Sequence, residues 1–297
     1  MVMVMAFFAV PSFATEETLP REELINKTGP EPAVYLASGT DEVRASLVAV
    51  GVSYEGNSAD HYGGAVCAYN YASLDFDNVT FTDNSSGGNG GGLWTYFNSD
   101  TEICGITAKG NSAKSTGGAI FARGNLNITS GEGIVNVFGG AAEGEANDAA
   151  EAGAICVSGP DNTVDARVSL SGISFVGNKT VSSSGAAVYI RYATGNVTEC
   201  SFVGNISAKN GGAVSLLKAD VTVSNTSFEG NTATSGGGAI YVTQSVEGKP
   251  NTTVNCTFKN NNAVNGGAVY VTETGIYRDG DTSVQSSSST FIGNTAK

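Results

Sequence analysis

The stretch FEGNTATSGGGAIYV, Phe228–Val242, holds one large aromatic residue, an asparagine three positions later, a glycine run and a short apolar segment. It is too short to bury its own apolar side chains. The same order of residues returns along the chain at intervals of about 27 residues. The pairs equivalent to Phe228/Asn231 are Tyr54/Asn57, Phe81/Asn84, Ala108/Asn111, Phe175/Asn178, Phe202/Asn205, Phe258/Asn261 and Phe291/Asn294, with a degenerate copy at Val137/Gly140.

A second block of sequence keeps phase with the first. Each asparagine is followed, after about six residues, by small residues and an aliphatic one. The copies are GGAV at 63–66, GGL at 91–93, GGAI at 117–120, GAI at 153–155, GAAV at 185–188, GGAV at 211–214, GGAI at 237–240 and GGAV at 266–269. Two blocks that stay in phase indicate a repeat architecture.

The residues after the glycines alternate as in a β-strand, where positions two apart share a face. The first aliphatic position predicts an inward column: Val66, Leu93, Ile120, Ile155, Val188, Val214, Ile240 and Val269. The next position predicts an outward, partly aromatic stripe: Cys67, Trp94, Phe121, Cys156, Tyr189, Ser215, Tyr241 and Tyr270.

A short repeat built of strands predicts an all-β fold, a parallel β-solenoid of about eight turns in which stacked turns share one core. A β-propeller is the main rival, but its blades of about 40–50 residues exceed the period. In a solenoid, like residues lie above like. We therefore expect Asn57, Asn84, Asn111, Asn178, Asn205, Asn231, Asn261 and Asn294 to form a hydrogen-bonded ladder at a corner.

The paired motif F-x-x-N and G-G-A-[ILV] resembles the repeat of chlamydial polymorphic outer-membrane proteins and related adhesin-like proteins. The resemblance covers about residues 50–297. It implies a right-handed parallel β-helix, similar to an autotransporter passenger, that is displayed at the cell surface and takes part in adhesion.

The two ends of the chain differ from its repetitive part. Residues 1–14 read as a signal peptide whose true start we expect upstream, because an apolar run precedes the small-x-small site Ser12–Ala14. We interpret residues 15–45 as an N-terminal leader and cap, and 46–297 as β-helix repeats that are incomplete at the C-terminus. A C-terminal anchor or translocation domain is therefore expected beyond this chain.

Composition favours an extracellular protein. The formal net charge is −13, and only 14% of the residues are charged. An acidic surface argues against nucleic-acid binding, which needs basic patches. We predict no transmembrane helix, no cofactor, and a secreted or cell-surface location at the outer membrane or cell wall. The five cysteines are interpreted as small buried fillers.

Acidic residues supply the candidates for chemistry. Asp75, Asp77 and Asp83 are candidate catalytic carboxylates, since β-helix polysaccharide lyases and hydrolases use carboxylates on adjacent turns. None of the three repeats in register with a neighbouring turn. Candidate metal ligands are Glu143, Glu145, Asp148, Asp279 and Asp281, and a solvated acidic loop is the alternative interpretation.

The outward aromatic stripe supplies the candidates for partner binding, with inter-turn loops beside it. Its aromatic members are Trp94, Phe121, Tyr189, Tyr241 and Tyr270. The alternative is that these rings stack on one another or lie under a loop.

Three functions stay open on this basis. The favoured one is an adhesin or passenger stalk without enzymatic activity that binds host, matrix or glycan surfaces. The others are a polysaccharide lyase or glycoside hydrolase on a pectate-lyase-like β-helix, and a passive structural rod of the cell surface.

Overall fold

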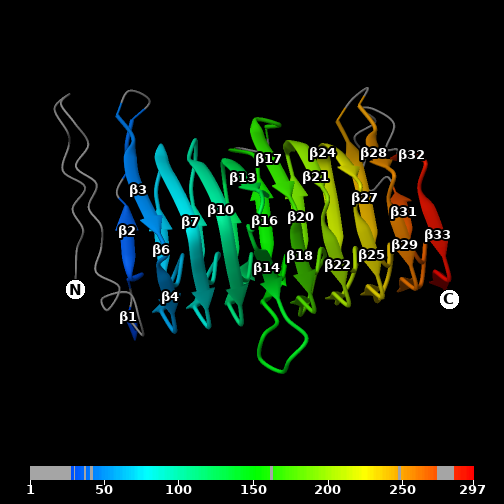
Figure 1. Cartoon of the computed structure of the whole chain (residues 1–297), viewed down its shortest axis with the longest axis horizontal. Helices are drawn as coiled ribbons and strands as arrows, with labels where there is room; N and C mark the ends of the chain where they lie inside the picture. The colour runs from blue at the N-terminus through cyan, green and yellow to red at the C-terminus, as the bar shows by residue number, and fades with distance from the viewer. Residues whose placement is uncertain are drawn as a thin grey trace.

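The structure is a computed structural model that describes residues 28–29, 31–36, 38–40, 43–160, 163–246, 249–272 and 284–297. In these ranges every regular element is a β-strand, and strands of successive turns pair in parallel (Figure 1). The predicted all-β parallel solenoid, with its period of about 27 residues, is confirmed. Within the same ranges no helix is long and apolar enough to cross a membrane.

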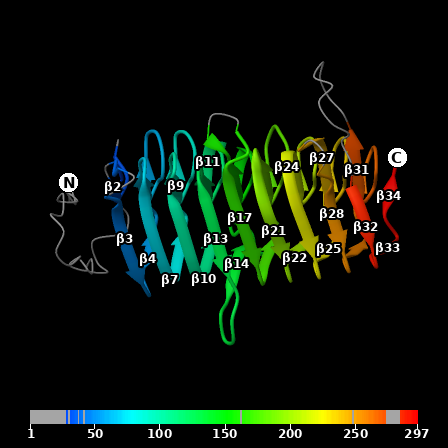
Figure 2. The ribbon, with the colours of Figure 1, turned by 90° about the horizontal axis from the view of Figure 1, so that it is seen from above.

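Each turn visits three sheets in a fixed order. The second turn illustrates it: β6 (Val66–Ala68) lies in a short sheet, β7 (Ala72–Thr82) in a long sheet, and β8 (Ser85–Ser86) in a corner sheet. A glycine loop then leads to β9 (Leu93–Thr95), which pairs with β6. The turns stand side by side from the N-terminal to the C-terminal end (Figures 1 and 2).

The short sheet carries the strands that follow the glycine blocks. It contains β2 (Val34–Leu36), β6, β9, β12 (Ile120–Ala122), β16 (Ile155–Ser158), β20 (Val188–Arg191), the first half of β24 (Val214–Ser224), β27 (Ile240–Ser245) and β31 (Val269–Thr272).

The long sheet shares β24 with the short sheet. Its other strands are β3 (Ala45–Val50), β4 (Ser53–Glu55), β7, β10 (Asp100–Lys109), β13 (Asn125–Thr129), β14 (Asn136–Gly139), β17 (Ala166–Ser171), β18 (Ile173–Val176), β21 (Ala193–Thr198), β22 (Ser201–Val203), β25 (Ser227–Glu229), β28 (Asn251–Val254), β29 (Thr257–Lys259), β32 (Val284–Ser287) and β33 (Thr290–Ile292).

The corner sheet consists of short strands that follow the repeated asparagine. They are β1 (Thr28–Gly29), β5 (Ser58–Ala59), β8, β11 (Ser112–Thr116), β15 (Asp148–Glu151), β19 (Lys179–Thr180), β23 (Ile206–Ser207), β26 (Thr232–Ala233), β30 (Asn262–Ala263) and β34 (Thr295–Ala296).

Strands already join the solenoid within the range assigned to the leader and cap. β1 pairs with β5, and β2 pairs with β6, both in parallel register. The signal-peptide interpretation of residues 1–14 falls outside the described residues and stays a prediction.

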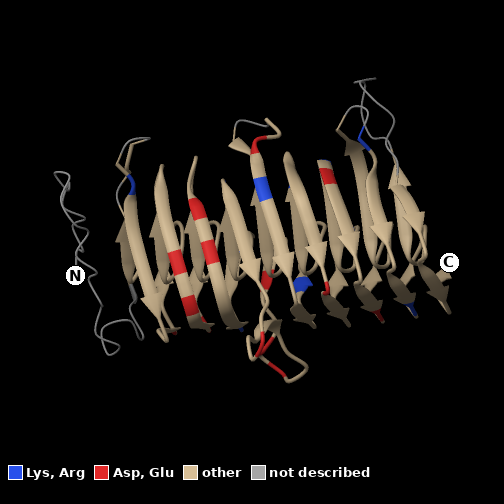
Figure 3. Cartoon of the chain, turned by 45° about the horizontal axis from the view of Figure 1, so that its top comes forward, with Lys and Arg blue, Asp and Glu red and all other residues tan. Residues whose placement is uncertain are grey.

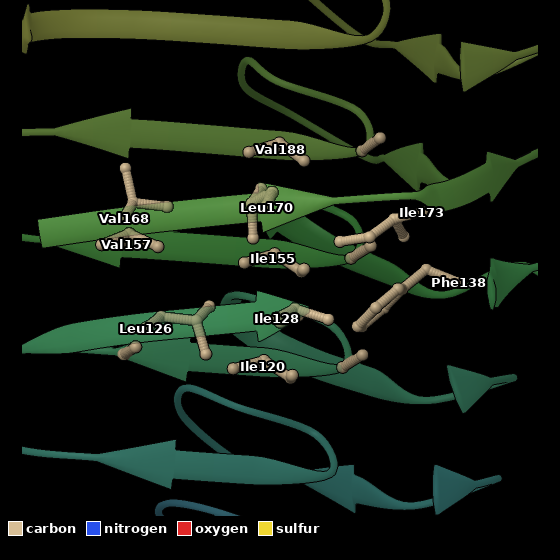
Figure 4. Packing of buried hydrophobic residues seen from close by; sticks show 14 of the residues in the cluster. Ile120, Leu126, Ile128, Phe138, Ile155, Val157, Val168, Leu170, Ile173 and Val188 are labelled. Atoms are coloured by element: carbon tan, nitrogen blue, oxygen red, sulfur yellow. The ribbon is translucent and has the colours of Figure 1, made fainter. Parts of the chain in front are cut away.

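The core runs along the rod axis between the sheets. Ile120, Ile155 and Val188 follow one another in register on the short sheet, facing residues such as Leu126 and Val168 on the long sheet (Figure 4). Because no single turn could cover these side chains, each apolar column is buried by the turns beside it.

The repeated aromatic position forms a stack inside the rod. From Phe138 onward the rings of consecutive turns lie 4.6–5.3 Å apart between centroids, and Tyr54 stacks on Phe81 at 4.7 Å. One expectation is wrong: Phe138, not Val137, occupies the aromatic position of its turn, since Phe138 pairs with Ala108 and Phe175.

The repeated asparagines form an unbroken ladder of side-chain amides. Each Nδ2 donates to Oδ1 of the next turn at 2.9–3.0 Å, from Asn57 through to Asn294. The degenerate copy again differs from expectation, because Asn147, not Gly140, supplies the rung between Asn111 and Asn178. A chain insertion precedes it, and the loop beyond β14 projects from the row of turns (Figure 1).

The glycine pair is required by backbone geometry. Its first member has positive φ, for example +66° at Gly90 and +72° at Gly117, which side chains rarely tolerate. At the second member a methyl group on Gly118 would lie 2.1 Å from the carbonyl oxygen of Gly153 in the next turn. The pair lets the chain bend sharply while adjacent turns stay in contact.

Candidate interaction surface

The outward stripe of the short sheet is not exposed as predicted. Trp94, Phe121, Tyr189 and Tyr241 keep only 3–8% of their surface exposed, and Tyr270 is half-buried. The first three join a buried cluster with Cys67, Ala152 and Cys156. The prediction of an open aromatic stripe is therefore wrong, and the alternative of a covered stripe fits.

The glycine loops explain this burial. A methyl group on Gly90 would lie 3.0 Å from Cβ of Trp94, and one on Gly185 would lie 3.1 Å from Cβ of Tyr189. The loop of each turn thus passes directly beside the outward residue of the strand that follows. The alternation of inward and outward residues along a strand does not predict that a glycine loop covers the outward ones.

An exposed aromatic group does exist near the N-terminal end, around Trp94. We call Tyr35, Tyr62, Tyr69, Trp94 and Tyr96 the tyrosine patch. Tyr35 and Tyr62 are 37% and 38% exposed, and Tyr69 and Tyr96 are half-buried. The patch lies on the outer side of β2, β6 and β9, toward the N-terminal end in Figures 1 and 2.

The rings of the tyrosine patch contact one another through Trp94. Ring centroids of Trp94 lie 4.7 Å from Tyr62, 5.1 Å from Tyr69 and 5.1 Å from Tyr96, and Tyr35 lies 5.4 Å from Tyr69. Tyr62 and Tyr96 are stacked on the indole, whereas Tyr69 meets it edge-on. Such contacts hold the rings of Tyr69, Trp94 and Tyr96 together, and Tyr62 adds its ring from the preceding loop.

The backbone of successive turns positions the two central tyrosines. The amide of Tyr69 donates to the carbonyl of Leu36 at 3.1 Å, and the amide of Tyr96 donates to that of Ala68 at 3.0 Å. Tyr69 lies two residues after Cys67 of the outward stripe, and Tyr96 lies two residues after Trp94. This spacing keeps side chains on one face of a strand. Extending the stripe by this spacing would have revealed them in the sequence.

Arg123 borders the tyrosine patch in the next turn. Its guanidinium carbon lies 4.0 Å from the ring centroid of Phe97 and 5.2 Å from that of Tyr96, and Nη1 donates to the Tyr96 hydroxyl at 3.3 Å. The positive charge is thus held against aromatic faces by cation–π attraction.

A polar atom inside the tyrosine patch lacks a partner. The indole Nε1–H of Trp94 is buried and has no hydrogen-bond acceptor among the described residues. Buried polar groups in native proteins are nearly always paired, so an orphaned donor calls for an explanation. Asn89, whose backbone carbonyl accepts from Gly63 beside Tyr62, has a buried Oδ1 that is likewise without a donor there.

The candidate catalytic carboxylates lie elsewhere, on the long sheet. Asp75 and Asp77 are on β7. Asp83 follows the end of β7 and packs against Gly110 of the next turn, where an added methyl group would lie 2.1 Å from the Asp83 Oδ1. Against expectation, Asp75 does have an acidic neighbour in register, Glu102 on β10 (Figure 3). The structure brings Asp75 and Glu102 together and leaves Asp83 apart.

Three acids on this surface, Asp77, Asp100 and Glu102, are engaged by neighbouring side chains. Asn78 donates to Asp77 at 2.9 Å, and Arg44 forms an ion pair with Asp100 at 2.9 Å. Asn127 donates to Glu102 from the next turn. These contacts describe a hydrogen-bonded outer surface, on which Asp75 and Glu102 form an adjacent acidic pair.

The candidate metal ligands do not converge in the described part of the chain. Lys109 pairs with Glu145 at 2.8 Å and lowers the pKa of that carboxyl, whereas burial raises the pKa of Asp148, which accepts from Ser112. Glu143 is exposed, and Asp279 and Asp281 lie outside the described residues. Among the described residues no three His, Cys, Asp or Glu side chains gather as a metal site would require.

Comparison with known proteins identifies the repeat. Residues 78–96, 199–216, 225–243 and 255–272 match the model of the Chlamydia polymorphic membrane protein repeat. Each segment covers a corner, its asparagine, the glycine block and a strand of the short sheet. Comparisons with curated proteins and with solved structures give no significant match. Four stretches of the solenoid thus match the Chlamydia polymorphic membrane protein repeat.

Proposed function

We propose that this chain is the passenger stalk of a surface adhesin and that it binds its partner through the tyrosine patch. The repeat and the solenoid fit an adhesin-like passenger at the cell surface or outer membrane. The observation that carries the proposal is the group of rings around Trp94 in which Tyr35 and Tyr62 are exposed, on a face where Phe121, Tyr189 and Tyr241 are buried.

The rod and the patch suit the two tasks of an adhesin. In a solenoid each turn contacts only its neighbours, so length is gained by adding turns. Tyrosine and tryptophan are enriched at the centres of protein interfaces because they offer large, rigid contact area with a polar edge. The inter-turn loops, including the acidic loop beyond β14, supply secondary contacts around such a centre.

A cell-binding experiment tests this function. The fluorescently labelled chain is incubated with cultured epithelial cells and bound label is measured by flow cytometry. We expect saturable binding that weakens by about tenfold or more in the double variant Tyr69→Ala/Tyr96→Ala. Tyr270→Ala is the matched control, since Tyr270 is half-buried on the same sheet at the other end.

Two results would contradict the proposal. The first is wild-type binding no greater than that of an unrelated acidic protein. The second is equal binding by the double variant and the Tyr270→Ala control, provided that both variants keep their fold.

A carbohydrate-active enzyme is the second candidate, favoured only by the adjacent carboxylates of Asp75 and Glu102. Acid–base cleavage of a glycosidic bond uses two such groups. Release of reducing ends from polysaccharides by the purified chain, abolished in Glu102→Gln, would support it. No release above background would remove it.

A further inference from the structure

We infer that the partner of the tyrosine patch is a neutral glycan, whose sugar rings stack on the tyrosines and whose hydroxyl groups accept the hydrogen bond that Trp94 offers. This inference rests on the proposed adhesin function and names the chemistry of its partner.

The first step concerns shape. The patch presents ring faces from adjacent turns, which repeat at about 4.8 Å along the rod. Tyr35 contacts Tyr69 of the next turn at 5.4 Å, and Tyr69 contacts Tyr96 of the turn after it at 6.3 Å, both in a tilted arrangement, so the three rings follow one another from turn to turn. The apolar C–H face of a pyranose packs on such rings, and an extended oligosaccharide can follow the row from turn to turn.

The second step concerns the orphaned donor. The Nε1–H of Trp94 lacks an acceptor among the described residues. An aliphatic protein surface docked on the patch would leave this donor unpaired, which opposes binding. Sugar hydroxyls both donate and accept, so they can pair with the indole and also with the orphaned Oδ1 of Asn89.

The third step concerns access to the indole. Tyr62, which stacks on Trp94 at 4.7 Å, comes from the loop that precedes Gly63 and is 38% exposed. A sugar ring that takes the place of Tyr62 keeps the stacking on the indole and brings a hydroxyl to its edge. Tyr62 then acts as a removable cover.

The fourth step concerns charge. The guanidinium of Arg123 is held on the rings of Tyr96 and Phe97. The pKa of Tyr35 is raised by burial first, then by Cys67 and by the nearby carboxylate of Glu31. The chain carries a formal net charge of −13. A sulfated or sialylated glycan would be repelled, so a neutral one is favoured.

Calorimetric titration of the full chain provides the test. The ligands are neutral hexasaccharides of glucose, of mannose and of N-acetylglucosamine, with a heparin-derived hexasaccharide as the anionic comparison. We expect at least one neutral ligand to bind and the anionic one not to bind. Tyr69→Ala should weaken binding by about tenfold or more, and Tyr270→Ala should leave it unchanged.

Two substitutions examine the indole. Trp94→Phe keeps an aromatic ring and removes the donor, so it should weaken glycan binding by about threefold to tenfold. Tyr62→Ala removes the cover and should bind at least as tightly as the wild type. Unchanged affinity in Trp94→Phe, or a loss in Tyr62→Ala as large as in Tyr69→Ala, would overturn the inference.

Failure of the inference can be told apart from failure of the adhesin function. If no hexasaccharide binds and the chain adheres equally to cells before and after enzymatic removal of their glycans, the glycan partner is wrong while adhesion stands. If the chain does not adhere to cells at all, the proposed function itself is wrong.

Discussion

The outer face of the short sheet differs between its first turns and its later ones, although the same backbone columns build both. In the first turns Tyr69 and Tyr96 contact the ring of Trp94 and stay half-exposed. In the later turns the equivalent column holds Arg191, which pairs with Leu217 of the next strand in register. The two regions therefore share one backbone arrangement and differ in the side chains that fill the outer column of the short sheet.

The later region satisfies its polar groups internally. Arg191 forms an ion pair with Glu151 at 3.2 Å, and its Nε donates to Ser158 at 3.2 Å. Tyr189 lies under this guanidinium, 5.6 Å from it, and is almost fully buried. The comparison teaches that the fold sets the columns, whereas the ability to bind depends on which residues fill them.

The largest expected effect concerns the cysteines beneath the two regions. Burial raises the pKa of Cys67 and of Cys156 to about 12 from the usual 9.0. Because the thiolate is the reactive form, at pH 8 both should react with iodoacetamide about a thousandfold more slowly than an unburied cysteine. Half-exposed Cys104 is the internal comparison, followed by mass spectrometry.

Rapid modification of Cys67 alone would mean that the tyrosine patch does not seal the sheet beneath it. The contrast between the regions would then be one of packing and not of surface chemistry.

The next effect separates residues that hold the fold from residues that bind. Phe202 is fully buried and stacks between Phe175 and Phe228, so Phe202→Ala should lower the free energy of unfolding by about 3–5 kcal/mol. Tyr69→Ala removes a half-buried ring and should cost clearly less. Urea unfolding followed by circular dichroism measures both. Equal losses would show that the tyrosines are part of the core.

The smallest effect compares the two arginines. Arg191→Met breaks a partly buried ion pair and should lower the free energy of unfolding by about 1–2 kcal/mol, since residual exposure screens the charges. Arg123→Met removes cation–π contacts at the open patch and should cost about 1 kcal/mol or less. Thermal unfolding provides the measurement. A larger loss in Arg123→Met would reverse the order of the two regions.

The solenoid could be predicted because its blocks repeat in phase. The inward columns and the asparagine positions follow from the spacing alone. The exception is the turn that contains Phe138 and Asn147, where an insertion separates residues that elsewhere lie three apart. Loop length alters closure free energy only slowly, so the chain makes a detour and then rejoins the ladder.

The binding surface could be predicted only in part. The alternation of inward and outward residues along the strand predicted that Trp94 points outward. It did not predict that Trp94 is buried, because the glycine loops cover it and the strand pattern does not specify their path. The pairing of Asp75 with Glu102 was missed although both positions lie in the repeat. The orphaned Nε1–H could not be foreseen, since it depends on the position of every nearby acceptor.

The fluorescence of Trp94 tests the central claim most directly, because Trp94 is the single tryptophan of the chain and lies inside the patch. Titration with the neutral hexasaccharides should shift its emission and reduce its quenching by acrylamide. The change should saturate at the affinity found by calorimetry and should need about tenfold more ligand or more in Tyr69→Ala. Emission that stays unchanged while calorimetry reports saturation would place the binding site elsewhere and contradict the account.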